Sequence, residues 1–325
     1  MEIGSFIELQ LPKGKEYYNQ QFDIARLNTG RSGIVHAYQL LNSKSIWLPI
    51  YQCDTVRESL LSVGADIHYY HIDNKFNPID LPEKTNDSVL FANYYGIMSH
   101  ERMSRLASNY KKVIIDNCQA FFCKPVESAM NVHSCRKFVG VPDGSYVIGA
   151  NAHIGVDRYP QCYSSDTATF LFSRIEYGCE GKGYELRKLN EDRIDREGVM
   201  RMSKLTHAIL DGTDYNEIQL IRRFNFMYAH MNLADINKID PMLYYDDDTI
   251  PMVYPLVVED DSLLKELQDA KHFQGHWWSY ICEEQPCDSF EHWLSRYIIP
   301  ITIDQRYNKE DINYLVNIIR SNHVR

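Results

Sequence analysis

Apolar and polar positions in the first half of the chain follow two different periods in alternation. Short runs rich in β-branched and aromatic residues predict strands at 46–51, 65–73, 89–96 and 113–115. Longer stretches with apolar positions at helical spacing predict helices at 54–64 and 99–110, and Ser99 is placed to cap the second. Because strands and helices alternate, we predict an α/β fold with a mostly parallel central sheet and crossover helices. The uniformly apolar strands indicate a sheet that is covered on both faces.

The second half of the chain has a different pattern. Residues 150–195 become polar, charged and interrupted by glycines, which predicts a long excursion or a domain junction; a lid, a subunit contact and a disordered loop all remain open for it. Residues 202–231 have helical spacing and predict a helix pair broken near Gly212. Strand and helix patterns then alternate again at 252–258, 263–270, 297–304 and 310–321. We predict a large α/β domain over residues 1–195 and a smaller α+β domain over residues 196–325.

The composition is that of an ordinary globular protein: of 325 residues, 44% are hydrophobic and 24% are charged. The formal net charge is −10. This acidic balance argues against nucleic acid as a main partner, because a phosphate backbone needs a basic stripe. No run approaches the roughly 18 uncharged apolar residues of a membrane-spanning helix, and the amino-terminal stretch does not have the pattern of a signal peptide. We therefore expect a cytoplasmic protein without a membrane partner.

The eight cysteines show neither a disulfide pattern nor a metal-binding pattern. None belongs to a C-x-x-C pair, and several lie inside apolar runs. We therefore expect reduced thiols and no zinc or other metal site.

The stretch VIIDNCQAFF places a carboxylate at the end of an apolar strand. In doubly wound sheets, ligands bind outside the carboxyl ends of the strands, and Asp116 is expected at such an end. A strand-terminal aspartate can instead cap the next helix. Capping does not explain the amide of Gln119, three positions further on.

Two further segments complete a possible site. Lys137 lies between apolar residues and a Pro-Asp-Gly turn, where a lysine is most often a solvated surface side chain. The turn that contains Gly30, Arg31 and Ser32 can direct backbone N–H groups at a phosphate. A lysine, a carboxylate and an anion-binding turn are the groups that pyridoxal phosphate needs: one forms a Schiff base, one pairs with the pyridine nitrogen and one holds the phosphate.

The order of the motifs along the chain resembles a known family. TGRSG is followed by WLPIYQCDTV, GADIHYYHID, NYYG, IIDNCQA and then the segment around Lys137. RMSKLTHAIL and IIPITIDQRYNKEDINYLVNII continue the likeness toward the carboxyl terminus. Together they resemble the DegT family of sugar aminotransferases. The resemblance implies the aspartate-aminotransferase fold (fold type I of the pyridoxal-phosphate enzymes) and a homodimer in which a second subunit covers each active site.

The resemblance also implies a role for each candidate residue. Lys137 would be the Schiff-base lysine, Asp116 would face the pyridine nitrogen, and Gln119 would lie at the phenolate side of the ring. The residues that would hold the phosphate are Gly30, Arg31 and Ser32. The implied reaction transfers an amino group from glutamate or glutamine to a keto sugar on a nucleotide carrier.

Several positions depart from the family pattern. The usual amino-terminal arm and first helix are missing before TGRSG. The residue that stacks on the pyridine ring is usually aromatic, but here the position holds Cys53, with Tyr51 beside it. The phosphate-binding serine is replaced by Val132, with Ser134 as the nearest serine, and the partner-subunit asparagine falls near Val199.

Three hypotheses therefore stay open. The chain is a divergent transaminase that uses Arg31 as a new counter-charge, a non-catalytic relative that acts by binding, or an unrelated α/β enzyme. In the last case Asp116 and Lys137 have acid–base roles without a cofactor.

Overall fold

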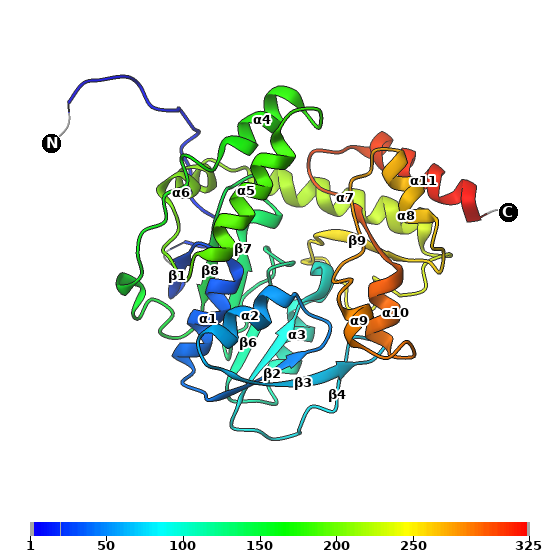
Figure 1. Cartoon of the computed structure of the whole chain (residues 1–325), viewed down its shortest axis with the longest axis horizontal. Helices are drawn as coiled ribbons and strands as arrows, with labels where there is room; N and C mark the ends of the chain where they lie inside the picture. The colour runs from blue at the N-terminus through cyan, green and yellow to red at the C-terminus, as the bar shows by residue number, and fades with distance from the viewer. Residues whose placement is uncertain (1–2, 20, 324–325) are drawn as a thin grey trace.

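The computed structural model of the chain describes residues 3–19 and 21–323. Its centre is an eight-stranded sheet with the strand order β1-β8-β7-β6-β5-β2-β3-β4 (Figure 1). The strands are β1 Ile24–Leu27, β2 Ser45–Pro49, β3 Asp66–Ile72, β4 Pro78–Ile79, β5 Ser88–Ala92, β6 Val113–Asp116, β7 Met130–Ser134 and β8 Ser145–Ile148. The central strands β7, β6, β5, β2 and β3 are parallel, whereas β8 and β4 are antiparallel to their neighbours. The predicted mostly parallel sheet is confirmed.

Helices cover both faces of this sheet, as the apolar strands predicted. Helices α1 (Gly30–Leu40) and α2 (Asp54–Ser62) pack on the face to which Leu90 points. Helix α3 (His100–Ala107) packs on the opposite face, to which the next residue, Phe91, points. Adjacent residues of a strand point to opposite sides, so an unbroken apolar run in β5 contributes to two separate cores.

The strand predicted over 89–96 is shorter than expected. β5 is followed by a 3₁₀ turn at Tyr94–Gly96. The side chain of Asn93 donates to the carbonyl oxygen of Met98 and accepts its N–H, which closes a loop directly after the strand. The aromatic run continues through this loop, so the residue pattern alone did not mark the end of the strand. Ser99 caps α3 as predicted, because its hydroxyl accepts a backbone N–H of the first turn.

The carboxyl-terminal part contains a smaller sheet and several helices. Its elements are α6 Lys204–Asp211, α7 Tyr215–Leu233, β9 Val253–Val257, α8 Leu263–Asp269, α9 Ile281–Glu284, α10 Phe290–Tyr297, β10 Ile298–Thr302 and α11 Lys309–His323. β9 and β10 pair antiparallel. Gly212 ends α6, which confirms the predicted break in the helix pair. Leu256 and Ile299 belong to the same buried cluster as Phe91, so one core runs from the large sheet into this part.

The segment expected to be an excursion contains two helices, α4 (Thr169–Tyr177) and α5 (Gly183–Arg196). A disordered loop, one of the alternatives for residues 150–195, is therefore wrong. In α5 only Asn190 and Ile194 are buried, and the Asn190 amide donates to the carbonyl oxygen of Pro142 over 3.0 Å. The proposed domain division after residue 195 falls in the last turn of α5 and stays a prediction.

All eight cysteines are free thiols, as expected. Within the described ranges, no helix combines the length and the apolar character that crossing a bilayer requires.

Candidate active site

The candidate residues lie at one edge of the large sheet. β1 and β7 are both antiparallel to β8, so their carboxyl ends lie at the same edge as those of the other parallel strands. Asp116 ends β6, Ser134 ends β7, and Thr29 follows β1 closely. This is the edge at which open α/β sheets bind ligands.

Asp116 is 8% exposed and accepts two hydrogen bonds. One of its oxygens, Oδ1, accepts the backbone N–H of Cys118 over 2.9 Å, and Oδ2 accepts Nε2 of Gln52 over 2.9 Å. The Gln52 amide is oriented in turn, because its Oε1 accepts the N–H of Cys53 and the Tyr280 hydroxyl donates to its backbone oxygen. The carboxylate is thus held as an acceptor with lone pairs left for a further donor.

Gln52 was not predicted as a site residue. It follows β2, and so lies at the same sheet edge as Asp116. The sequence signal that could have identified Gln52 is its position shortly after the end of a predicted strand.

Gln119 is fixed by the loop after β5. Its Oε1 accepts the backbone N–H of Tyr95 over 2.6 Å, and the residue is 7% exposed. This bond commits the amide oxygen and leaves Nε2 as the atom that can donate to a ligand.

Lys137 ends a 3₁₀ turn, Cys135–Lys137, directly after β7, and its side chain is exposed. The neighbouring Arg136 forms an ion pair with Glu191 of α5. On the other side, the guanidinium of Arg222 lies 4.5 Å from the centre of the Phe138 ring and donates to the backbone oxygen of Lys137 over 3.5 Å. Burial lowers the pKa of Arg222 to about 10. The backbone around Lys137 is anchored while its amine stays accessible.

The turn before α1 is a well-formed helix start. Thr29 caps α1, since its hydroxyl oxygen accepts the N–H of Ser32 over 3.1 Å and the same hydroxyl donates to the Ser32 Oγ over 2.8 Å. Gly30 is the first helical residue. Arg31 does not offer a free charge, because it forms a 2.6 Å ion pair with Asp195 of α5. The hypothesis of Arg31 as a new counter-charge therefore requires displacement of this carboxylate.

Cys118 is the point at which the separate segments meet. A Cβ atom added at Gly30 would lie less than 3.0 Å from the Cys118 sulfur and 3.7 Å from the Cβ of Ser134. Burial and the Asp116 carboxylate raise the pKa of the Cys118 thiol well above its usual value, whereas the nearby charge of Lys137 acts in the opposite direction. The Gly30 turn and the Asp116 carboxylate thus meet at one buried thiol, and Lys137 follows β7 at the same edge of the sheet.

Tyr51 and Cys53 differ in their placement. Tyr51 is fully buried: its hydroxyl lies 2.7 Å from that of Tyr95, and its ring packs edge-on against Trp278 with centroids 4.6 Å apart. Burial raises the pKa of Tyr51. Cys53 is partly exposed, precedes α2 and lies 3.0 Å, Sγ to Oγ1, from Thr55. Tyr51 is therefore a packing residue here, and the placement of Cys53 at the ring-stacking position stays a prediction.

The side chains fit pyridoxal phosphate in most respects. Asp116 offers an acceptor for a protonated pyridine nitrogen, Gln119 offers a donor, and the exposed Lys137 follows β7 at the same sheet edge. The α1 start provides N–H groups for a phosphate. The weak point is Cys53, which gives less stacking surface than an aromatic ring.

Comparison with known proteins supports the fold. No protein-family model matches the chain, and no curated protein matches its sequence. A DegT DnrJ EryC1 StrS aminotransferase from Brucella abortus superimposes with a TM-score of 0.62 at 13% identity, covering 94% of this chain and 87% of that one. The sugar aminotransferase CalS13 from Micromonospora echinospora gives 0.61 at 15% identity, covering 92% and 87%. The chain has the fold of the sugar aminotransferases.

A third similar structure is that of NtdA from Bacillus subtilis with bound cofactor PMP. It has a TM-score of 0.59 and 12% identity, and covers 91% of this chain and 73% of that one. The predicted fold class, an aspartate-aminotransferase-like α/β fold, is confirmed by this sugar aminotransferase fold. The site roles of individual residues stay predictions.

Proposed function

We propose that the chain is a pyridoxal-phosphate-dependent aminotransferase that transfers an amino group to a keto sugar. The observation that carries the proposal is the placement of the Gly30 turn, Asp116 and Lys137 at one edge of the sheet, where the turn and Asp116 meet at Cys118 and Lys137 follows β7. A protein that only binds a partner, or that has only a structural role, does not need an anion-binding turn, a carboxylate and a lysine at the ligand-binding edge of the sheet. The same convergence disfavours an unrelated enzyme that uses only a carboxylate and an amine.

Each residue has a defined task in this proposal. When bound, pyridoxal phosphate supplies the electron sink for carbon–hydrogen bond cleavage. Lys137 is the covalent attachment point and holds the proton that is moved at its Nζ. Asp116 keeps the pyridine nitrogen protonated, and Gln52 keeps the carboxylate oriented toward it. Gln119 donates through Nε2 to the oxygen substituent of the ring.

The phosphate is expected at the start of α1. The first N–H groups of the helix and its positive end favour an anion there. Ser32 and Ser134 are both buried; Ser32 lies in the first turn of α1, and the Cβ of Ser134 lies 3.7 Å from a Cβ built on Gly30, so their hydroxyls are candidate side-chain donors. Arg31 adds its charge only if the phosphate replaces Asp195.

The proposed keto-sugar substrate and the proposed homodimer rest on the family resemblance and on the names of similar structures. CalS13 is described as a sugar aminotransferase, which supports a keto-sugar acceptor for this chain. A nucleotide carrier and glutamate or glutamine as donor follow from the family resemblance alone. The exposed Lys137 is consistent with a second subunit that closes the site in a homodimer. α4 and α5 offer an apolar surface for such a contact, with exposed side chains at Phe172, Ile175, Tyr177, Tyr184 and Leu189.

A spectroscopic experiment tests the assignment. The purified chain is incubated with pyridoxal phosphate, dialysed and treated with borohydride, and the adduct is located by peptide mass spectrometry. We expect a near-visible absorption band that borohydride removes, and an added cofactor mass on the peptide that contains Lys137. Lys137→Ala should lose both signals, whereas Lys111→Ala should keep them, because Lys111 is exposed and precedes the amino end of β6, opposite the sheet edge that holds Asp116.

Two outcomes would contradict the proposal. A chain that stays colourless at saturating cofactor contradicts cofactor binding, and a band that persists in Lys137→Ala contradicts the lysine assignment. Transamination is tested separately: glutamate should remove the band and release 2-oxoglutarate in an amount equal to the enzyme. A coloured protein that does not react with glutamate, glutamine or other amino acids is a binding protein.

A further inference from the structure

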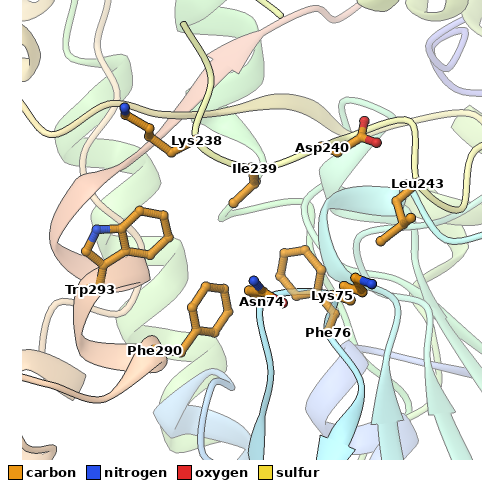
Figure 2. Close-up of a pocket in the computed structure, with 9 residues that line it drawn as sticks. All are labelled: Asn74, Lys75, Phe76, Lys238, Ile239, Asp240, Leu243, Phe290 and Trp293. Carbon is orange, nitrogen blue, oxygen red and sulfur yellow. The ribbon is translucent and has the colours of Figure 1, made fainter.

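A cavity opens where the edge of the large sheet meets the carboxyl-terminal part of the chain (Figure 2). Its volume is about 480 Å³, within the range of small-molecule sites. The lining residues are Asn74, Lys75, Phe76, Lys238, Ile239, Asp240, Leu243, Phe290 and Trp293. None of them belongs to the candidate active site. Junctions between two parts of a fold are frequent places for ligands.

Three aromatic rings from distant segments form the floor and one wall of this cavity. Phe290 and Trp293 lie on α10 with ring centroids 5.6 Å apart, and Phe76 lies 6.2 Å from Phe290. Figure 2 shows these rings around one open space. The Trp293 indole is held in place, because its Nε1 donates to Glu259 over 2.6 Å. Fixed rings of this kind offer flat faces on which another ring can stack.

The turn between β3 and β4 is braced in an uncommon conformation. The Asp73 carboxylate accepts the backbone N–H groups of Lys75 and Asn77, each over 2.8 Å, and Arg102 donates to the Asn77 side chain over 2.6 Å. Phe76 has a φ of 56°, in the left-handed region that non-glycine residues rarely adopt. Strain of this kind persists where the surroundings impose it, and it gathers at ligand sites. The turn presents a preformed wall to the cavity.

Two lysines and one aspartate, Asp240, line the mouth of the cavity. Lys75 and Lys238 form no ion pair within the part of the chain that the structure describes. Figure 2 shows Lys238 on the side of Trp293 and Lys75 on the opposite side, with the Asn74 side chain between them. Unpaired ammonium groups beside stacked rings suit a ligand with a flat ring and an anionic group.

We propose that this cavity binds a nucleoside phosphate. The base stacks on the rings of Phe76, Phe290 or Trp293, the sugar hydroxyls lie near Asn74 and Asp240, and a lysine of the mouth contacts the phosphate. The argument uses only the lining residues, so it stands apart from the proposed aminotransferase activity.

Isothermal titration calorimetry on the full chain tests the proposal, with UMP and AMP as probes. We expect saturable binding of both, and weaker binding of uridine by about tenfold, since a hydrogen bond to a charged group is lost. Lys75→Ala or Lys238→Ala should weaken UMP binding by about tenfold without changing uridine binding. Asn74→Ala and Trp293→Ala should also weaken UMP binding, and Lys111→Ala should not. Circular dichroism confirms that each variant is folded.

Several results would overturn the nucleoside phosphate. If neither UMP nor AMP gives binding heat at millimolar concentration, the cavity is not a nucleoside phosphate site. If glucose 6-phosphate, which has no base, binds as tightly as UMP, the base adds nothing to the affinity and does not stack on the rings. Binding that is unchanged when both lysines are replaced together shows that another surface holds the phosphate. Because the titration omits pyridoxal phosphate, these outcomes leave the test of Lys137 unaffected.

Discussion

Gly30 offers a direct test of the convergence at the candidate site. The change is Gly30→Ala, made both in the natural chain and together with Cys118→Ala. In the natural chain the new methyl group would lie less than 3.0 Å from the Cys118 sulfur, a distance that forces the surroundings to move. Overpacking of this kind costs about 1–3 kcal/mol of unfolding free energy.

The Cys118→Ala variant lacks the sulfur atom that the new methyl group would meet. Without the sulfur, the nearest remaining atoms are the Cβ atoms of Ser134 and residue 118, at 3.7 and 3.8 Å, which is ordinary van der Waals contact. Alanine is also a better helix former than glycine by up to about 1 kcal/mol. Gly30→Ala should therefore be close to neutral or slightly stabilising in the Cys118→Ala background, which gives a coupling free energy of about 1–3 kcal/mol.

The assay is urea unfolding of the four proteins of this double-mutant cycle, followed by far-ultraviolet circular dichroism. The cost of Cys118→Ala itself cancels in the cycle. Effects that add within about 0.5 kcal/mol would show that the two residues are not in contact, and would remove the observation on which the proposed function depends.

Three further predictions use the same unfolding measurement. Thr29→Ala should cost about 1 kcal/mol, since the cap on the Ser32 N–H is lost, while Thr29→Ser should retain most of it; equal effects would contradict the capping role. Gln52→Leu should cost about 1.5–3 kcal/mol because the buried Asp116 loses a donor, and no loss would mean that the bond does not form in solution. Burial lowers the pKa of His133 to about 3, so between about pH 6.5 and pH 3 only the unfolded chain takes up the proton. Stability should fall with pH by up to about 1.4 kcal/mol per unit there, and His133→Asn should show a shallower slope; an unchanged slope would contradict a buried neutral imidazole.

The elements that could be predicted are those with a buried, periodic face. The helix pair over 202–231 was predicted with its break, because buried positions recur at helical spacing on both sides of Gly212. In contrast, α5 buries only Asn190 and Ile194, and α4 buries no residue. A helix without an apolar face carries little periodic signal, so both were taken for an excursion.

The site residues that could be predicted are polar residues at or just after the end of a predicted strand. Asp116 and Gln119 follow one apolar run, and their place at the sheet edge comes from the strand pattern. The pairings with other segments could not be predicted. The partner of Asp116, Gln52, is 64 positions away, and the pairing of Arg31 with Asp195 depends on where α5 docks. Such contacts are set by the tertiary arrangement, which a single sequence does not encode in any local pattern.

The hydrogen bond from Tyr280 to the backbone oxygen of Gln52 spans 228 positions and ends on the same residue whose side-chain amide orients Asp116. Exchanging the carboxyl-terminal third of this protein for that of a relative would therefore disturb the proposed cofactor pocket even if every pocket residue were retained. A chimera of that kind would have to keep Tyr280, which bonds to Gln52, as well as the residues at the strand ends.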